Sequence, residues 1–275
     1  MTAEKTLSKL SPIGLGTSRV GSFSNPASPG NSRRLLDTAL NAGITVFDTS
    51  NIYGQGDSER TIGLAIAGKR DRVFLVTKAG RTFSTKYRLA RWLKPFVRPL
   101  LASNGKGAIV TARRADAMSA DWRPAHIAAS LTGSLRRLRT DHVDGFLLHS
   151  PPAEVIRDPQ IAASLARLKS DGKVRNFGIS CDDRECLEAA LEISALSILQ
   201  LPWDLLATLG GLAEELRRRD IIVLAREVIA LQPDKDPLDA IRASLRHPAV
   251  SCTLVGTTRI DRVRMLAALA QEISR

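Results

Sequence analysis

Four ionisable side chains of four types stand where apolar, strand-like runs end. Asp48 and Lys78 close two successive runs, Tyr53 follows Asp48 by five residues, and His149 closes a later run. Each has an ordinary structural explanation when it is taken alone, such as a turn cap, a solvated surface charge, half-buried packing or a hydrogen-bonded strand end. If the fold brings them together, they could reduce a carbonyl by general acid catalysis.

The chemistry would divide among the four groups. A phenol has an unperturbed pKa of roughly 10, so Tyr53 needs a neighbouring cation before it can deliver a proton efficiently near neutrality. Lys78 would be that cation, Asp48 would hold the ammonium in place, and His149 would donate a hydrogen bond to the substrate oxygen. No side chain can supply a hydride, so this reaction requires a cofactor.

The elements that must position these groups are predicted by hydrophobic patterning. Eight short apolar runs rich in β-branched residues predict strands at residues 10–17, 44–50, 72–79, 143–150, 174–180, 198–204, 221–227 and 251–256. Helical patterns lie at about 31–42, 57–68, 125–138, 160–171, 183–192, 209–219, 236–246 and 260–273, with Asn31 and Asp183 as expected helix starts and Gly43 and Gly172 as C-terminal glycines.

This eightfold alternation predicts an α/β fold of the closed (β/α)8 TIM-barrel type, with functional groups at the C-terminal ends of parallel strands. An open doubly wound sheet is the alternative, although it usually has fewer repeats and a glycine-rich first turn. The chain of 275 residues suits one barrel domain over residues 1–275, and 44% hydrophobic with 25% charged residues excludes disorder, collagen and a heptad rod.

Composition also bounds the compartment and the metal chemistry. The N-terminus lacks the apolar stretch of a signal peptide, and no apolar run approaches the roughly 20 residues of a membrane-spanning helix, so we expect a cytoplasmic protein. The three cysteines, Cys181, Cys186 and Cys252, form no C-x-x-C pair. They predict buried reduced thiols and indicate neither a disulfide framework nor a metal site.

The net charge of +12 comes from one segment. Residues 69–114 contain one acid, Asp71, and thirteen bases: Lys69, Arg70, Arg72, Lys78, Arg81, Lys86, Arg88, Arg91, Lys94, Arg98, Lys106, Arg113 and Arg114. Much of the segment belongs to a predicted loop insertion at about 80–122, longer than a barrel connection needs, and such loops are often functional. Its one-sided charge would attract anionic carbonyl compounds.

Other interpretations of this loop remain open. Cations interleave there with Trp92 and Phe96, as in a surface-seeking amphipathic element, but Pro95 and Pro99 interrupt any long helix. No recognised nucleic-acid motif occurs. We therefore expect neither nucleic acid nor an integral membrane position for this chain, and the plain alternative is a solvated basic loop.

Six blocks of the sequence resemble the aldo-keto reductase family. They occur in the family's order and at compatible spacing, and they cover nearly the whole chain apart from the basic loop: residues 46–66, 73–80, 134–152, 172–180, 199–206 and 254–263. The resemblance implies a barrel that binds NADPH in an extended form without a Rossmann fold. It also implies a catalytic tetrad of Asp48, Tyr53, Lys78 and His149, with Tyr53 as the general acid in reduction.

The resemblance further implies a set of residues that bind NADP(H). They are Thr17, Ser18, Asp48, Ser180, Cys181, Gln200, Trp203, Arg226, Gly256, Thr257, Thr258 and Arg262. Within this set, Ser180 and Gln200 would bind the nicotinamide carboxamide and Arg226 would lie near the pyrophosphate. Arg262 would bind the 2'-phosphate and favour NADPH over NADH, because a guanidinium suits a phosphate monoester.

The chain departs from the family at several cofactor positions. Cys181 stands where an asparagine is usual, Trp203 replaces a stacking tyrosine, and Met265 and Leu266 replace residues that commonly contact adenine. Only 23 residues separate Glu227 from Ser251, which is short for the connection that often folds over the pyrophosphate. These differences predict weaker fixation and faster release of the cofactor.

Two functions of different classes follow. The first is an NADPH-dependent reductase that converts an aldehyde or ketone to an alcohol, or runs in reverse, on a small and anionic substrate. The second is a non-catalytic NADP(H)-binding regulatory or interaction subunit. The intact tetrad favours the enzyme.

Overall fold

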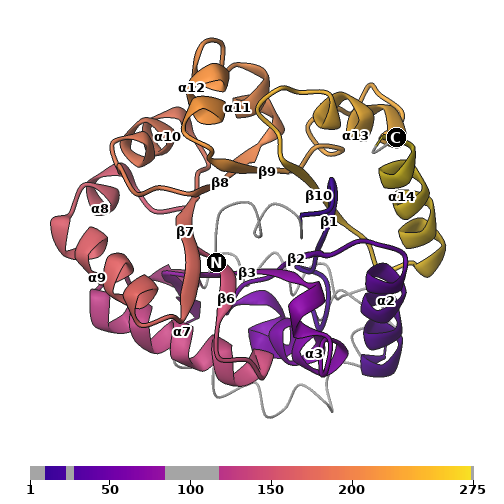
Figure 1. Ribbon diagram of the computed structural model, residues 1–275, viewed down its shortest axis with the longest axis horizontal. Coiled ribbons are helices and arrows are strands. Elements are labelled where there is room, and N and C mark those ends of the chain that lie inside the picture. Colours follow the sequence, from indigo (N-terminus) through magenta and orange to yellow (C-terminus); the bar gives the residue numbers. More distant parts are fainter. Residues whose placement is uncertain (1–9, 23–27, 84–117, 274–275) are drawn as a thin grey trace.

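The computed structural model describes residues 10–22, 28–83 and 118–273, and eight of its strands close into one parallel barrel. The barrel strands are β1 (Ile13–Gly16), β2 (Val46–Asp48), β3 (Phe74–Ala79), β6 (Val143–His149), β7 (Val174–Ser180), β8 (Ile198–Pro202), β9 (Ile222–Arg226) and β10 (Cys252–Gly256). They neighbour one another in the order β1-β10-β9-β8-β7-β6-β3-β2 and back to β1 (Figure 1). The predicted TIM barrel and all eight predicted strands are confirmed.

Helices surround the barrel in Figure 1 and connect its strands. They are α2 (Pro29–Asn41), α3 (Asp57–Ala65), α7 (Pro124–Leu138), α8 (Ala153–Ile156), α9 (Pro159–Ser170), α10 (Arg184–Leu191), α11 (Trp203–Ala207), α12 (Leu212–Arg218), α13 (Pro237–Leu245) and α14 (Ile260–Ile273), with short 3-10 turns η1 (Tyr53–Gly56) and η2 (Arg70–Arg72). The eight predicted helices are present, within a few residues of their expected ends.

Local signals explain most helix ends. Asp183 caps α10 by accepting a hydrogen bond from the Cys186 amide, as predicted. Gly43 and Gly172 follow α2 and α9 with φ of 92° and 74°, the left-handed conformation that glycine adopts at low cost. The predicted start at Asn31 is wrong, because Ser28 is the N-cap and accepts from the Asn31 amide at 3.1 Å. Pro29 then occupies the first turn, where its missing N–H costs nothing.

Two short strands and two short α-helices were not predicted. The two described ends of the basic insertion pair as an antiparallel ribbon of β4 (Arg81–Phe83) and β5 (Met118–Ala120), so residues 80–122 are not loop throughout. The short helices α8 and α11 follow β6 and β8 and begin after Pro152 and Pro202. Each is about one turn long, too short for a hydrophobic period to show in the sequence.

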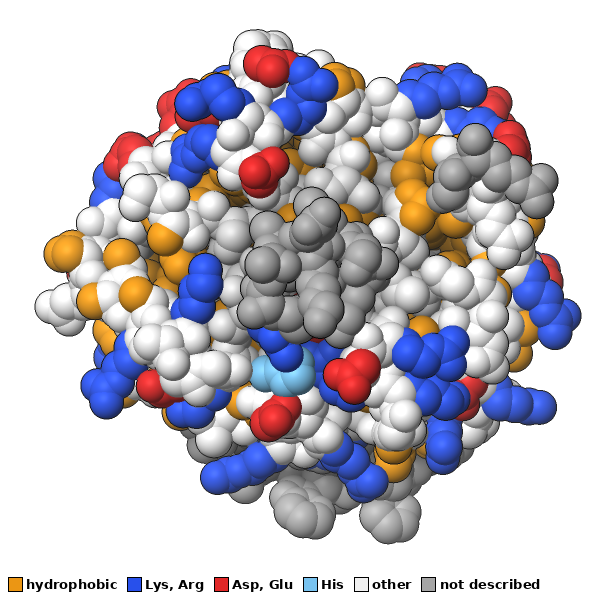
Figure 2. All heavy atoms as spheres, viewed as in Figure 1, with side chains coloured by type: hydrophobic (Ala, Val, Ile, Leu, Met, Phe, Trp, Pro, Cys, Tyr) orange, Lys and Arg blue, Asp and Glu red, His pale blue; other side chains and the backbone are white. Residues whose placement is uncertain are grey.

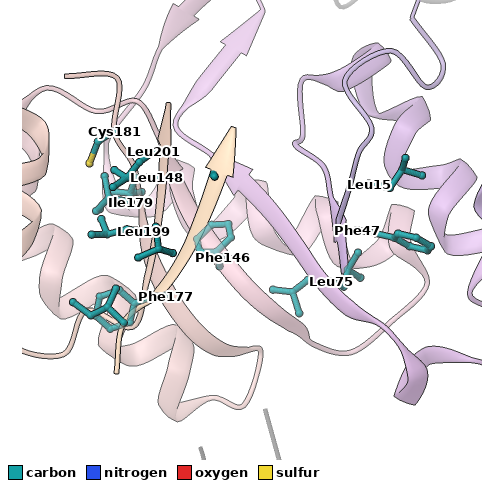
Figure 3. Close-up of a cluster of buried hydrophobic side chains, with 14 of the residues drawn as sticks. Leu15, Phe47, Leu75, Phe146, Leu148, Phe177, Ile179, Cys181, Leu199 and Leu201 are labelled. Carbon is teal, nitrogen blue, oxygen red and sulfur yellow. The ribbon is translucent and has the colours of Figure 1, made fainter. Parts of the chain in front are cut away.

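Side chains of the strands alternate between two apolar layers. One layer fills the barrel and includes Val46, Phe74, Val76, Leu147 and Ile198. The other lies between strands and helices, and Figure 3 shows Phe47, Leu75, Phe146, Phe177 and Cys181 among its members. Because successive strand residues point to opposite faces, this alternation fixes which later residues point into the barrel.

Charged side chains of both signs surround the barrel. On the face in Figure 2, basic and acidic groups interleave around the rim. Within the described part of the basic segment, Lys69 pairs with Asp37 at 3.0 Å and Arg70 pairs with buried Asp144 at 2.7 Å. Trp92, Phe96 and eight of the thirteen bases lie outside the described residues. No helix among the described residues is long and apolar enough to cross a membrane.

Candidate active site

Six polar side chains occupy inward-pointing positions at the C-terminal ends of the strands, which we call the mouth of the barrel. They share the alternation of the barrel-filling apolar residues, and they are Asp48 on β2, Lys78 on β3, His149 on β6, Ser180 on β7, Gln200 on β8 and Arg226 on β9. The register brings neighbours level, with His149 opposite Ser180 and Ser180 opposite Gln200. Parallel strands therefore deliver all six groups to one end of the barrel.

A buried ion pair lies at the centre of the mouth. The Lys78 ammonium donates to Asp48 Oδ1 at 2.6 Å and to the Thr49 carbonyl at 3.0 Å. Both side chains are almost completely buried, at 0% and 7% exposed. Burial alone would lower the pKa of Lys78, but Asp48 and Tyr53 raise it, so the net pKa lies above its usual value. Lys78 is therefore a permanently charged ammonium inside the barrel.

Tyr53 reaches the mouth from a loop with unusual backbone geometry. Gly54, Gln55 and Gly56 have φ of 57°, 60° and 84°, three left-handed residues in succession. A Cβ on Gly54 would lie 2.8 Å from the Gly21 backbone, so glycine is required there by space as well as by conformation. The loop places the Tyr53 ring centroid 5.1 Å from Lys78 Nζ.

The pKa of Tyr53 responds to this setting in two directions. Burial raises the pKa of the phenol most strongly, the charge of Lys78 lowers it, and Asp48 raises it again. The net pKa lies above the ordinary value of 10.0. Tyr53 is therefore protonated in the resting protein, with the Lys78 ammonium beside its ring.

A second buried ion pair anchors the Tyr53 loop from behind. The loop runs directly into α3, where fully buried Glu59 accepts from Arg137 Nε of α7 at 2.5 Å and from the Thr77 hydroxyl at 2.7 Å. Thr77 precedes Lys78 and points out of the barrel. The same contact set thus holds β3, α3 and α7 together, and it fixes Lys78 and the Tyr53 loop relative to each other.

His149 faces Tyr53 across the mouth. Their rings meet edge to face with centroids 6.0 Å apart, and His149 Nδ1 lies 3.2 Å from the Ser50 hydroxyl. Burial, followed by the charges of Lys78, Arg81 and Arg226, lowers the pKa of His149 well below its ordinary 6.5. The imidazole is therefore neutral at physiological pH and has a single N–H, which can serve as a hydrogen-bond donor without adding charge.

A hydrogen-bond chain extends from the ion pair along the inside of the barrel. Gln200 Nε2 donates to Asp48 Oδ1 at 2.9 Å, and the Ser180 hydroxyl donates to Gln200 Oε1 at 3.1 Å. This leaves lone pairs on Ser180 Oγ and one N–H on Gln200. The pair can therefore accept from and donate to a primary amide, which is what a nicotinamide carboxamide presents.

Arg226 supplies a cation at the rim beside this chain. Its guanidinium donates to the Cys181 carbonyl at 2.9 Å and forms ion pairs with Asp182 and Glu227. Among the residues that the structure describes, none is a hydrogen-bond partner for its buried Nε. A buried donor of this kind, on a cation shared by two carboxylates, fits an additional anionic oxygen such as that of a pyrophosphate.

Two predicted cofactor residues point out of the barrel. The Cys181 side chain is buried in the outer apolar layer, next to Ile179 and Leu201 in Figure 3, so its thiol does not face the mouth. Thr17 is also fully buried, and its hydroxyl donates to the Asp48 carbonyl at 2.8 Å and accepts from Ser58 at 2.7 Å. The alternation explains both, because each residue directly follows an inward-pointing one.

The remaining predicted cofactor residues lie at the rim. Gly256 ends β10, and Thr257 and Thr258 lead into α14, with Arg262 exposed in the first turn of that helix. The start of a helix favours anions, so this group suits a phosphate. Ser18 is exposed just after β1, whereas Trp203 is half-buried at the start of α11, with its ring 6.1 Å from that of His247.

The structure adds four residues to the mouth that sequence reasoning missed. Ser50 and Asn51 follow β2, Arg81 begins β4, and Asp182 follows β7. Asp182 accepts from Ser150 at 2.8 Å and lies 3.6 Å from Arg81, and it also pairs with Arg226. Their position two or three residues past the end of a barrel strand was the available signal.

Comparison with known proteins agrees with this arrangement. The family model described as "Aldo/keto reductase family" matches residues 12–236. "Uncharacterized oxidoreductase YcsN" of Bacillus subtilis is 33% identical over 150 residues, which are 53% of this chain and 41% of that protein. The chain thus spans less than half the length of that relative.

Two further relatives match over most of their length. "6-dehydroglucose reductase" of Agrobacterium fabrum is 27% identical over 94% of this chain and 88% of its own. An aldo-keto reductase from Klebsiella pneumoniae, solved in complex with NADP and acetate, has a TM-score of 0.66 at 23% identity and covers 94% of this chain and 85% of its own. The latter similarity is one of fold. With the family model matched over most of the sequence, the chain belongs to the aldo/keto reductase family.

Proposed function

We propose that this protein is an NADP(H)-dependent oxidoreductase that interconverts a carbonyl compound and its alcohol. The observation that carries the proposal is the arrangement of Lys78, which is buried against Asp48 at 2.6 Å and lies 5.1 Å from the Tyr53 ring, with neutral His149 facing that ring. A fully buried lysine beside a half-buried tyrosine is costly to maintain for packing alone.

Each residue has a separate task in reduction. His149 donates a hydrogen bond that orients the carbonyl oxygen, and Tyr53 transfers its proton to that oxygen as the carbonyl carbon becomes tetrahedral. When bound, a nicotinamide cofactor supplies the hydride to that carbon. Lys78 then stabilises the Tyr53 phenolate until the phenol takes a proton from solvent, and Asp48 keeps Lys78 in place. In the oxidation direction, the Tyr53 phenolate accepts the proton of the alcohol.

The residues at the mouth fit NADP(H). Ser180 and Gln200 would hold the carboxamide, Arg226 would contact the pyrophosphate, and Thr257, Thr258 and Arg262 would bind the 2'-phosphate. The buried, unpartnered Nε of Arg226 and the exposed Arg262 in the first turn of α14 support this assignment. The presence of NADP in the Klebsiella pneumoniae relative points the same way. Thr17 and Cys181 would contribute only through backbone packing.

The electrostatics favour an anionic substrate. Arg81 donates through Nε to the His149 backbone carbonyl at 3.1 Å, so its guanidinium lies beside His149 at the mouth. Among the described residues, the nearest carboxylate to this guanidinium is that of Asp182. The distance from Arg81 Nη2 to Asp182 Oδ2 is 3.6 Å, which is too long for a strong hydrogen bond. Burial is the main cause of the lowered pKa of His149, and positive charge from Lys78, Arg81 and Arg226 lowers it further. The same potential would attract a carboxylate or phosphate near the carbonyl.

A substrate screen with the purified protein tests the proposal. Aldehydes and ketones, including para-carboxybenzaldehyde and its uncharged methyl ester, are incubated with NADPH or NADH, and loss of the reduced nicotinamide is followed by absorbance. We expect turnover with NADPH and a lower KM for the carboxylate than for the ester, with the difference reduced in Arg81→Met. Tight NADPH binding without turnover of any carbonyl or alcohol would instead support the alternative, a regulatory NADP(H)-binding subunit.

A further inference from the structure

A closed ring of hydrogen bonds holds His149 at the mouth. Arg81 Nε donates to the His149 carbonyl at 3.1 Å, Asn51 Nδ2 donates to the Arg81 carbonyl at 3.1 Å, and Ser50 Oγ lies 3.1 Å from Asn51 Oδ1 and 3.2 Å from His149 Nδ1. The ring joins residues that follow β2 and β3 to the last residue of β6. It therefore fixes both the backbone and the imidazole of His149.

One proton has two candidate acceptors in this ring. The Ser50 hydroxyl has a single hydrogen, while Asn51 Oδ1 and His149 Nδ1 both lie within hydrogen-bond distance of it. The Asn51 amide cannot exchange its ends without losing its bond to the Arg81 carbonyl, so its oxygen faces Ser50. If Ser50 donates to Asn51, then Nδ1 must donate to Ser50, and the imidazole carries its proton on Nδ1.

The numbers of donors and acceptors around Ser50 favour the arrangement in which Ser50 donates to Asn51 and His149 carries its proton on Nδ1. Ser50 Oγ then donates once, to Asn51, and accepts twice, from His149 Nδ1–H and weakly from the Ile52 amide at 3.5 Å, which is the full capacity of a hydroxyl. The other arrangement, in which Ser50 donates to Nδ1, places two oxygens at 3.1 Å with no proton between them. Ser50 is completely buried, so its bonding is made within the protein.

We propose that Ser50 and Asn51 are positioning residues that set the tautomer of His149, holding its proton on Nδ1 in the resting protein and releasing it to Nε2 when a carbonyl binds. This inference rests on the proposed function, in which His149 donates to the carbonyl oxygen. Nε2 is the nitrogen not engaged by Ser50, and it can donate only after the tautomer changes. In that change Nε2 takes up one proton from solvent at the mouth and Nδ1 gives one up to solvent, so the imidazole remains neutral overall. The Ser50 hydroxyl then turns from Asn51 to donate to Nδ1.

Two substitutions of Asn51 distinguish control of the His149 tautomer from a merely structural role of the Asn51 hydrogen bond to the Arg81 carbonyl. Asn51→Ala and Asn51→Asp both remove the donor to the Arg81 carbonyl, so any effect of losing that anchor is common to both. They differ in the acceptor, which Asn51→Ala deletes and Asn51→Asp strengthens by charge. The ring thus predicts an Nε2–H imidazole in Asn51→Ala and an Nδ1–H imidazole in Asn51→Asp.

The direct readout is the ¹⁵N chemical shifts of the His149 ring, assigned with His149→Gln and measured at about pH 8, well above the ordinary histidine pKa. We expect Nδ1–H in the wild type and in Asn51→Asp, and Nε2–H in Asn51→Ala. An Nε2–H imidazole in the resting wild type, or the same tautomer in both variants, would overturn the inference. These spectra need no turnover, so they are independent of whether the proposed reaction is correct.

Kinetics supply a second readout. Because a hydrogen bond to a charged acceptor changes an equilibrium by about 10- to 100-fold, kcat/KM for carbonyl reduction should be higher in Asn51→Ala than in Asn51→Asp by a factor in that range. When Ser50→Ala is also present, the ratio of kcat/KM between Asn51→Ala and Asn51→Asp should fall to about 3-fold or less. Without the Ser50 hydroxyl, the charge of the aspartate reaches His149 only through a weak, solvent-screened interaction. An unchanged ratio in the presence of Ser50→Ala would show that Asn51 acts through its charge and not through Ser50.

Discussion

In the proposed reaction Lys78 has both a structural and a catalytic role, and a pair of substitutions separates the two. Lys78→Met removes the ammonium but leaves the Asp48 carboxylate buried, with Gln200 Nε2 at 2.9 Å as its remaining side-chain donor. Breaking a buried ion pair by removing one partner costs about 3–5 kcal/mol. We therefore expect Lys78→Met to lower the free energy of unfolding by about that amount, together with a large loss of carbonyl reduction.

Adding Asp48→Asn to Lys78→Met removes the uncompensated charge. An asparagine can still accept from Gln200, so the double variant should recover most of the lost stability. It should not recover activity, because Tyr53 still lacks the cation that stabilises its phenolate. The expected loss is that of general acid catalysis, about 10²- to 10⁴-fold.

Urea unfolding followed by circular dichroism gives the stabilities, and the steady-state rate of nicotinamide oxidation gives the activities. The single variant Asp48→Asn serves as the control for changes at that carboxylate. Recovery of both stability and turnover in the double variant would refute the reasoning, because it would show that Lys78 only neutralises Asp48. Unchanged stability in Lys78→Met would equally contradict the buried pair.

Three other perturbations have defined outcomes. Arg262→Ala should weaken NADPH binding by about 10- to 100-fold, the value of a charge-assisted hydrogen bond, and leave NADH binding nearly unchanged in fluorescence titrations; equal losses for both would place Arg262 elsewhere. The pKa of His149 lies below 6.5 in the folded protein, so the unfolded chain binds the extra proton first as pH falls. The free energy of unfolding, measured with urea, should therefore decrease below about pH 6.5 by up to about 1.4 kcal/mol per pH unit. His149→Gln should make that decrease less steep. Neutral replacements of Arg88, Arg91 and Arg98 should raise KM for carboxylated aldehydes but not for uncharged ones, with the difference shrinking at high salt; equal kinetics would leave the loop a solvated insertion.

Much of the candidate site could be predicted because its residues stand at the ends of apolar runs, and the types of their side chains indicate the chemistry. Asp48, Lys78 and His149 each close an apolar run, and a parallel barrel sends every such residue to the same mouth. The outward orientation of the Thr17 and Cys181 side chains could also have been predicted from the sequence. Each follows an inward-pointing residue, so the period of two already assigns its side chain to the outer layer.

Other features could not be predicted because they depend on irregular backbone. Ser150 and Glu227 adopt φ of 55° and 58° without being glycines, and these turns bring Ser150 to Asp182 and Glu227 to Arg226. No residue pattern marks such turns in advance. The ring through Ser50, Asn51 and Arg81 likewise joins the ends of three strands, and its partners become neighbours only when the barrel closes.

If Tyr53 is the proton donor in carbonyl reduction, then Tyr53→Phe should remove the reaction and leave cofactor binding intact. The substitution keeps the ring that Lys78 and His149 contact and removes only the hydroxyl. Measured together, NADPH affinity should be nearly unchanged and single-turnover reduction should fall by about 10²- to 10⁴-fold or more, as expected for loss of a general acid. Near-normal reduction by Tyr53→Phe would contradict the account.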